Sequence, residues 1–325
     1  MFYKTAFDVQ ARFLVISKIQ TKTGHSMHMK VLQDREIVIN IQSRDETMTA
    51  EEVLLGDREW YVKTADCTKE LAQFDDNSID LVFGSPPYAE KGERYLGRPT
   101  KWTTDDWIDW MLKLTMEAVR VSNGYVIWVA NGAVRNGRYL PACEGLIWKA
   151  HEQGLICERP CIWHKNAPPN RRDWFGNDWE YVVAFKSAAK NLYFDWEAVA
   201  EPPKYKSGGR FRQRAANGNR RLGSEYPTNK LARPRDVVRV TVGGGHLGSE
   251  LAHENEAPFP EGLAEYFVRA CSPKNGVVLD PFSGSGTTGA VAIKHGRRYV
   301  GFDARKSQAV LSRKRIRLAQ QGHER

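Results

Sequence analysis

A short apolar run, a glycine-rich loop and a helix-forming stretch follow one another near the end of the chain. The run VVLD at residues 277–280 has strand character, and Gly284, Gly286 and Gly289 then spell G-x-G-x-x-G. Asp303 lies 19 positions beyond Gly284. Glycines at this spacing let a nucleoside approach the backbone, and an acid at this distance binds ribose hydroxyls. The pattern predicts a nucleoside-binding α/β unit rather than a tight turn without a ligand, and no lysine follows the last glycine as in a phosphate-binding P-loop.

The alternation of strand-like and helix-like stretches extends over most of the chain. Apolar runs typical of buried strands are separated by stretches whose apolar residues recur at helical spacing. Strands that alternate with helices favour a parallel sheet of the doubly wound kind. The predicted fold class is α/β, with strands expected at 60–66, 78–83, 124–131, 159–165, 180–186, 277–280 and 297–303 and helices at 67–75, 105–121, 141–154, 259–272, 287–296 and 306–321.

The residues before the glycines indicate which nucleoside is bound. Asp280, Pro281 and Phe282 join the strand to the loop. An acid at this point can bind an ammonium group, whereas it would repel a pyrophosphate, and Phe282 can line the pocket beside it. Only one strand and one helix are expected after this unit, whereas a dehydrogenase carries it at the start of its nucleotide domain. S-adenosyl-L-methionine is therefore the expected cofactor, and an NAD enzyme is the disfavoured alternative.

The second informative stretch is LVFGSPPYAE at residues 81–90. Pro86 and Pro87 have no N–H to donate and fix φ near about −65°, so they end the apolar strand in a stiff loop. Ser85 places a hydroxyl at one end of this loop, and Tyr88 places an aromatic ring at the other. These four residues by themselves are compatible with a strand-terminating turn as well as with a binding loop.

Together, SPPY at 85–88 and DPFSGSGTT at 280–288 resemble the amino-group DNA methyltransferases. The order, with the catalytic motif first and the cofactor motif last, is similar to the β-class permutation of that family. The resemblance covers about residues 60–318 apart from a polar insert. It implies a Rossmann-like, S-adenosylmethionine-dependent methyltransferase sheet with permuted motif order and a target-recognition insert.

The resemblance implies a catalytic role for Ser85, Pro86, Pro87 and Tyr88. The loop would hold a base flipped out of the duplex, because the amino group is otherwise inaccessible. The Ser85 hydroxyl and the Pro86 carbonyl would accept the hydrogens of the amine, which is preorganised electrostatics rather than covalent chemistry. Tyr88 would stack on the base. No cysteine nucleophile is needed, unlike in carbon-5 cytosine methylation.

The resemblance implies the cofactor-binding residues as well. Asp303 would hold the ribose hydroxyls, although the family more often has the longer Glu at this position. Asp66 would lie near the cofactor, and the alternative for it is an ordinary acid at the end of a strand. The remaining residues, expected at the methionine and sulfonium side and at the start of the helix, are Asp280, Pro281, Phe282, Gly284, Gly286 and Thr287.

Two target bases are compatible with the catalytic loop. In this family Ser at its first position is commoner among N4-cytosine enzymes, and Asp or Asn is commoner among N6-adenine enzymes. The expected activity is therefore site-specific DNA methylation at N4 of cytosine, with N6 of adenine as the alternative. An RNA or protein methyltransferase with the same loop is a further alternative. A non-catalytic DNA-binding protein is disfavoured because SPPY and Asp280 are intact.

The polar stretch 188–256 is the candidate target-recognition region. The formal net charge of +9 and the pI of about 9.2 favour a polyanionic partner, and arginine suits guanine edges and phosphates alike. A single arginine is expected to contact only backbone phosphate, and the block as a whole to contact double-stranded DNA. The expected DNA-binding residues are Arg210, Arg212, Arg214, Arg220 and Arg221, with Tyr205, Phe211 and Asn217 in the same block.

The chain is expected to consist of four parts. These are an accessory segment at 1–58 without clear helix or strand order, a catalytic half of the methyltransferase domain at 59–187, the target-recognition region at 188–256 and a cofactor-binding half at 257–325. Trp102, Trp107 and Trp110 are assigned to helix packing. The resemblance also implies two candidate partners, a cognate restriction endonuclease and a second copy of the chain.

Five scattered cysteines fit a reducing cytoplasm rather than a disulfide framework. No apolar run of about 18 residues is present, so no membrane span is expected. The expected location is the cytoplasm of a prokaryotic cell or of a phage-infected host. Cys157, Cys161 and His164 lie close together, but no second pair of ligands accompanies them, and no metal is expected.

Overall fold

The computed structural model forms two compact units, Met1–Thr49 and Ala50–Arg325. In the first unit, β1 (Lys18–Gln20), β2 (Ser26–Val31) and β3 (Ile37–Gln42) form an antiparallel sheet in that order. The structure describes residues 18–20, 26–31, 37–42, 49–89, 102–167, 174–187, 192–204, 210–214, 217–225, 230–243 and 245–322; side chains are not described in the three strands of the first unit or at 211–214 and 221–225.

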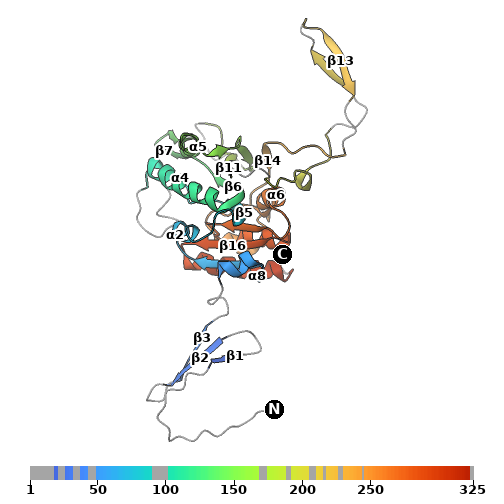
Figure 1. Cartoon of the computed structure of the whole chain (residues 1–325). Coiled ribbons are helices and arrows are strands. Elements are labelled where there is room, and N and C mark those ends of the chain that lie inside the picture. The colour runs from blue at the N-terminus through green and yellow to red at the C-terminus, as the bar shows by residue number, and fades with distance from the viewer. Residues whose placement is uncertain are drawn as a thin grey trace, which may run out of the picture. The chain divides into compact units, whose positions relative to one another are not determined.

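The second unit combines one large sheet with helices, as Figure 1 shows. The helices are α1 (Ala50–Leu55), α2 (Cys67–Leu71), α4 (Thr104–Val121), α5 (Ala142–Glu152), α6 (Glu261–Cys271), α7 (Thr287–Lys294) and α8 (Lys306–Gln320). The strands of the large sheet are β4 (Trp60–Thr64), β5 (Ile79–Gly84), β6 (Ser122–Ala130), β9 (Ile156–Cys157), β10 (Cys161–His164), β11 (Trp179–Lys186), β14 (Val237–Arg239), β15 (Val277–Asp280) and β16 (Arg298–Asp303).

The second unit also contains smaller elements. Two hairpins consist of β7 (Ala133–Arg135) with β8 (Arg138–Leu140) and of β12 (Arg210–Arg214) with β13 (Arg220–Glu225). The short 3-10 helices are η2 (Glu197–Val199) and η3 (Glu250–Glu254). No helix in the described part of the chain is long and apolar enough to cross a membrane.

The sheet has the strand order β14-β10-β11-β6-β5-β15-β16-β4, and β9 pairs with β11. The five strands from β6 to β4 are parallel, whereas β11 runs antiparallel to β6. From β5 the chain passes through α4 to β6, and from β15 it passes through α7 to β16 in the opposite direction along the sheet. The boundary between β5 and β15 is therefore the point where the winding direction reverses, the usual place for a ligand in such sheets.

Period-2 alternation in the strands divides the core into two layers. Val82 of β5 belongs to a cluster that also contains buried residues of α2, α4 and α5. Leu81 and Phe83 of the same strand belong to the other cluster, with buried residues of α6, α7 and α8. Because successive side chains of a strand point to opposite faces, one apolar strand fills both layers. The predicted doubly wound α/β sheet is confirmed by this arrangement and by the fold comparisons below.

Local signals in the sequence explain where the helices begin. Asp66 caps α2 by accepting the backbone N–H of Thr68 at 3.0 Å. Thr103 and Asp106 form a reciprocal capping box at the start of α4. Each cap satisfies N–H groups that have no partner within the first helical turn. The helices predicted at 67–75 and 105–121 therefore begin within one residue of their predicted positions.

The structure corrects the sequence analysis in two places. The described part of residues 1–58 contains three strands and α1, although the sequence shows no clear helix or strand order there; the run IVINIQ of β3 is rich in β-branched residues that favour strands. In addition, the chain divides after Thr49 rather than at residue 58, because Val53 of α1 is fully buried in the core of the second unit. The finer division at 187 and 256 remains a prediction.

A buried arginine connects the end of the glycine loop with the surrounding helices through hydrogen bonds and an ion pair. Arg315 of α8 is fully buried, and its guanidinium donates to Thr287 Oγ1 at 2.8 Å, to the Leu247 carbonyl at 3.0 Å and to Glu261 Oε1 at 2.6 Å. These contacts join the first residue of α7 to α6 and α8. Without Arg315, the Thr287 hydroxyl and the Leu247 carbonyl would lose this donor, whereas Glu261 would keep its second partner, Lys294, whose Nζ is 2.8 Å from Glu261 Oε2.

Replacing Arg315 by Met is therefore expected to lower the free energy of unfolding by about 2 kcal/mol, because a buried polar group left without its hydrogen-bond partner costs about 1–3 kcal/mol. Urea unfolding followed by circular dichroism measures this change. Arg269→Met is the control, because Arg269 forms a partly exposed i,i+4 pair with Glu265 at 2.9 Å, and pairs that solvent can reach contribute less than about 1 kcal/mol. Equal losses in the two variants would contradict the structural role of Arg315.

Candidate functional site

A cavity of about 540 Å³ opens at the point where the winding of the sheet reverses. Segments that follow β4, β5, β15 and β16 line it, so the carboxyl ends of four parallel strands contribute to one site. Segments before α6 and between β5 and α4 complete the wall. The lining residues are Thr64, Ala65, Asp66, Cys67, Ser85, Pro86, Pro87, Tyr88, Trp102, Trp110, Asn255, Ala257, Pro258, Phe259, Pro281, Phe282, Ser283, Gly284, Ser285, Thr287, Asp303, Ala304 and Arg305.

The SPPY loop leaves β5 directly into this cavity. The Ser85 hydroxyl donates to the Val129 carbonyl of the neighbouring strand β6 at 2.9 Å. Its hydrogen is thereby directed into the sheet, and its lone pairs remain available to accept hydrogen bonds. The Trp107 indole N–H donates to the Pro87 carbonyl at 2.6 Å. The loop is thus held at both ends by hydrogen bonds, in addition to the fixed φ of its two prolines.

The glycine loop lies next to the SPPY loop. Gly284 and Gly286 have φ of +49° and +82°, which L side chains rarely adopt. A Cβ at Gly286 would lie 2.9 Å from the Ser312 Cα, so helix α8 packs directly against the loop. Gly286 is the N-cap of α7, and Thr287 is its first residue. The loop therefore presents Gly284, Ser285 and Thr287 to the cavity, while Gly286 provides the turn.

Asp280 lies behind the cavity wall rather than in it. Its side chain is 1% exposed, and its Oδ1 accepts the backbone N–H of Phe282 at 2.9 Å. A Cβ at Gly84 would lie 2.5 Å from the same Oδ1, so the carboxyl group packs against the glycine that precedes Ser85. Burial raises the pKa of Asp280 to about 7. Asp280 thus joins the cofactor loop to the catalytic loop at the reversal point of the sheet.

The other two predicted acids line the cavity. Asp303 is 9% exposed; its Oδ2 accepts the Gly284 N–H at 2.9 Å, and its Oδ1 accepts the Arg305 N–H at 2.8 Å. Burial raises its pKa above the ordinary value. Asp66 uses Oδ1 to cap α2. A carboxylate has about four lone-pair positions, so both acids retain capacity for ligand hydroxyls.

These features fit a nucleoside that carries an amino acid. A Cβ at Gly284 would lie 2.6 Å from Asn255 Nδ2, too close for an ordinary contact. The glycine therefore keeps the space between the loop and Asn255 open. Two acids face the cavity, and aromatic residues form an apolar wall in which the rings of Trp110 and Phe282 are 5.8 Å apart. In the described residues, no group of three or more His, Cys, Asp or Glu is placed to hold a metal ion.

The predicted DNA-binding arginines are separated in sequence from the residues that line the cavity. All five belong to β12 and β13, which pair with Arg214 opposite Arg220. Arg210 and Arg220 are exposed. The side chains of Arg212, Arg214, Arg221 and Phe211, and all of Tyr205, lie outside the described residues. The pairing of two arginine-rich strands was not foreseen from the low periodicity of the insert.

Several cavity residues were missed or assigned differently. Trp107 is fully buried as expected, but Trp102 and Trp110 contribute to the cavity wall as well as to packing, with their rings 4.8 Å apart. Asn255 and Phe259 also line the cavity. Their stretch precedes the helix before the cofactor loop, and nothing in its residue pattern indicates which side chains face a ligand.

Comparison with known proteins identifies the family. A family model described as DNA methylase, of the N6/N4 type, matches residues 79–314. The chain belongs to this DNA methylase family. It is a site-specific DNA amino-methyltransferase, and the predicted amino-group DNA methyltransferase family is confirmed. Because the match includes both the SPPY loop and the glycine loop, it also disfavours the NAD enzyme.

Two curated relatives extend over most of the chain. The type II methyltransferase M.ScaI of Streptomyces caespitosus is 30% identical over 237 residues, which are 70% of this chain and 71% of the relative. The DNA adenine methyltransferase YhdJ of Escherichia coli K12 is 27% identical over 260 residues, which are 78% of this chain and 81% of the relative. The name of YhdJ specifies adenine and that of M.ScaI specifies no base, so these two relatives do not decide between the two target bases.

Solved structures confirm the fold. The cytosine-N4-specific PvuII DNA methyltransferase has a TM-score of 0.58 at 20% identity and covers 80% of this chain and 86% of its own. The putative DNA modification methylase TTHA0409 of Thermus thermophilus, complexed with S-adenosyl-L-methionine, has a TM-score of 0.54 at 23% identity and covers 80% of this chain and 94% of its own.

Proposed function

We propose that the enzyme transfers the methyl group of S-adenosyl-L-methionine to the exocyclic N4 amine of a cytosine flipped out of double-stranded DNA. The observation that carries this choice of base is the serine at the start of the catalytic loop, which lines the cavity and whose hydroxyl hydrogen is already donated to the Val129 carbonyl. S-adenosyl-L-methionine supplies an electrophilic methyl group on a sulfonium centre. The residues described above supply the binding, the orientation and the hydrogen-bond acceptors.

The exocyclic amine is a weak nucleophile because its lone pair is conjugated with the ring. Acceptors that bind its N–H groups increase the electron density on nitrogen as the new N–C bond forms. The Ser85 hydroxyl and the Pro86 carbonyl are the proposed acceptors, and Tyr88 stacks on the flipped base. Their fixed positions act as preorganised electrostatic stabilisation. The bond between the methyl group and sulfur breaks as the N–C bond forms, the nitrogen releases one proton to solvent, and S-adenosylhomocysteine is the second product.

The cavity cysteine does not provide a covalent alternative. Cys67 is the one cysteine among the described cavity residues. Burial raises the pKa of its thiol to about 12. The thiolate is the nucleophilic form, so this cysteine is protonated and unreactive near neutral pH. Direct attack by the amine is therefore the mechanism that the site supports.

On the cofactor side, Asp303 and Asp66 are proposed to bind the ribose hydroxyls and the nearby part of the nucleoside. Phe282, Gly284 and Thr287 border the methionine and sulfonium side, and Asp280 supplies the negative charge beneath it. The arginine-rich strands β12 and β13 are the proposed DNA contact. A cognate restriction endonuclease and a second copy of the chain remain candidate partners by family resemblance.

Adenine N6 is the second candidate, favoured by the similarity to YhdJ. The experiment that separates the two uses unmethylated mixed-sequence DNA, S-adenosyl-L-methionine and the full chain, followed by digestion to nucleosides and mass spectrometry. N4-methylcytosine is the expected product. N6-methyladenine would retain the mechanism and overturn the choice of base. Absence of any methylated base while the cofactor binds would contradict the proposed function under these conditions and direct the search to RNA.

A further inference from the structure

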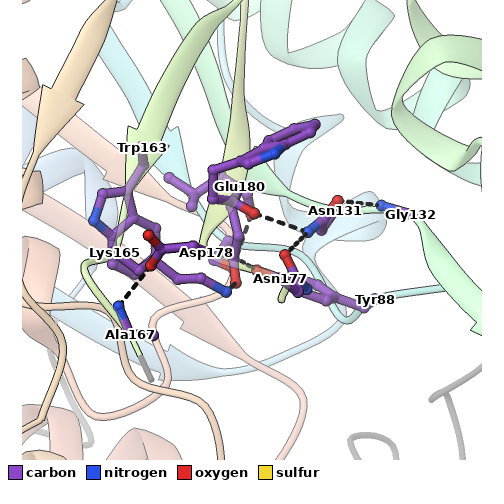
Figure 2. Close-up of polar contacts among 12 residues, drawn as sticks. Tyr88, Asn131, Gly132, Trp163, Lys165, Ala167, Asn177, Asp178 and Glu180 are labelled. Carbon is purple, nitrogen blue, oxygen red and sulfur yellow. Dashed lines mark hydrogen bonds and ion pairs between the residues drawn. The ribbon is translucent and has the colours of Figure 1, made fainter. Parts of the chain in front are cut away.

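A charged pair lies against the hydroxyl of Tyr88, outside the residues that line the cavity. Lys165 follows β10 directly, and its Nζ is 3.1 Å from Oε1 of Glu180, the second residue of β11. Both side chains are only 13% exposed. The Tyr88 hydroxyl donates to the other oxygen of the same carboxylate, Oε2. Figure 2 shows the three side chains converging at the end of the catalytic loop.

The direction of β11 brings Glu180 to this place. Because β11 runs antiparallel to β6, its first residues lie at the sheet edge where the parallel strands end, with Tyr181 opposite Ala130. The preceding residues are fixed on both sides. Asp178 accepts the Ala167 N–H at 2.6 Å, and Asn131, just after β6, donates to the Trp179 carbonyl at 3.2 Å. The carboxylate is thus presented to Tyr88 from a rigid strand end (Figure 2).

The chemistry of this pair favours a role in orientation. A buried ion pair costs desolvation energy and is weak evidence for stability by itself. Lys165 provides the counter-charge for the Glu180 carboxylate, and an ionised acceptor forms a shorter and stronger hydrogen bond than a neutral one. A bond at the hydroxyl fixes the far end of the tyrosine ring, whereas the backbone fixes the near end. A stacking platform needs this kind of support, because productive sites hold their groups to about 0.5 Å.

We propose that Glu180 and Lys165 are positioning residues, which hold the ring of Tyr88 in the orientation that stacks on the flipped base. This inference rests on the proposed function of the catalytic loop. The pair does not touch the base or the cofactor; it acts through the Tyr88 hydroxyl. A merely structural pair would join β10 to β11, and its effect on turnover would not depend on that hydroxyl.

The test replaces the pair by apolar residues. Lys165→Met with Glu180→Leu removes both charges together, and such replacements are often neutral for stability. The turnover number is measured at saturating S-adenosyl-L-methionine and DNA, together with cofactor affinity by calorimetry and the thermal midpoint. We expect kcat to fall about tenfold, the effect of losing one hydrogen bond to a charged group, with cofactor affinity unchanged within about twofold.

Tyr88→Phe retains the ring and removes the hydroxyl. It is expected to lower kcat by a similar factor, and its combination with the apolar pair is expected to lower kcat no further, because both changes remove the same contact. The matched control is Glu158→Gln, which breaks the Lys186–Glu158 pair of 2.5 Å at the other end of β11. This variant is expected to retain full turnover.

If the apolar pair fails to fold, Glu180→Gln provides the same comparison with Tyr88→Phe. Full turnover in a folded variant with the apolar pair would overturn the positioning role. The role would also be overturned if kcat in the variant that combines the apolar pair with Tyr88→Phe fell by the product of the two separate factors. Both results presuppose that the wild-type chain methylates DNA. Lack of methyl transfer by the wild-type chain would instead overturn the proposed function, so the two failures are distinguishable.

Discussion

Replacing Ser85 by Ala is expected to lower the rate of methyl transfer by about 100-fold to 1,000-fold, the loss typical when one preorganised donor or acceptor is removed from the reacting atoms. Ser85 lines the cavity, and its hydroxyl hydrogen is directed to the Val129 carbonyl. The variant therefore loses an acceptor for the amine. Single-turnover transfer from labelled S-adenosyl-L-methionine to DNA measures the rate.

Cofactor affinity serves as the internal control for Ser85→Ala. In the proposed mechanism Ser85 contacts the base and not the cofactor, so calorimetric affinity for S-adenosyl-L-methionine should change less than about twofold, well under the roughly 1.4 kcal/mol that corresponds to a tenfold difference. Ser78→Ala is the matched variant, because Ser78 also donates to a backbone carbonyl, that of Asp75 at 2.8 Å, at the opposite end of β5. An unchanged rate in Ser85→Ala would remove the hydroxyl from the mechanism.

Replacing Asp280 by Asn is expected to weaken S-adenosyl-L-methionine binding by about 100-fold or more, since removing one partner of a buried charge pair, here the proposed pair with the cofactor ammonium group, costs about 2–5 kcal/mol in binding. Asn retains an acceptor for the Phe282 N–H, so the loop should keep its conformation. The variant isolates the charge, whereas Asp280→Ala removes both the charge and the acceptor. Calorimetry is carried out at a pH of about 7.5, where the wild-type carboxyl is largely ionised despite its raised pKa. Comparison of the Ala and Asn variants then separates the contribution of the charge from that of the hydrogen-bond acceptor.

The pKa of Asp280 gives this prediction a pH dependence. Burial raises the pKa to about 7 from the ordinary 3.8, so the folded chain holds this proton over a range where the unfolded chain has released it. The stability contributed by this group consequently falls as the pH rises from the ordinary value to the raised one. Asp280→Asn should remove that loss and be at least as stable as the wild type above neutral pH.

Binding should show the opposite trend to stability. An ammonium group pairs with the ionised carboxylate, so wild-type affinity is expected to increase as the pH rises from about 6 toward about 7.5, while the amine of the ligand remains protonated. Asp280→Asn should lack this increase. The control is Asp80→Asn, whose carboxylate accepts the Val277 N–H at 2.7 Å at the far end of β15. Equal affinities in wild type and Asp280→Asn would show that the acid only organises the loop.

The sequence by itself determined the family, the doubly wound α/β class and the two loops of the site. SPPY and DPFSGSGTT carry this information locally, because prolines end a strand and glycines permit a left-handed turn wherever they stand in a fold. Apolar periodicity similarly located most strands and helices of the second unit. These properties depend on residues that are close together in the sequence, so the sequence alone is enough to predict them.

The tertiary structure alone decided how the two loops meet. They are far apart in the chain, and the parallel pairing of β15 with β5 places Asp280 against Gly84, immediately before Ser85. The same applies to Trp102 and Trp110, which were assigned to helix packing but also line the cavity. A side chain's partner across the sheet is set by strand order, which local periodicity does not encode.

Glu180 illustrates the same limit most clearly. In the sequence it is one residue of an apolar strand, 92 positions from Tyr88. The antiparallel direction of β11 turns its first residues toward the edge that carries the catalytic loop, and the largely buried lysine after β10 supplies the counter-charge. Strand direction is a long-range property, because it follows from how the whole chain packs both faces of the sheet; only the folded structure therefore connects this carboxylate with the catalytic tyrosine.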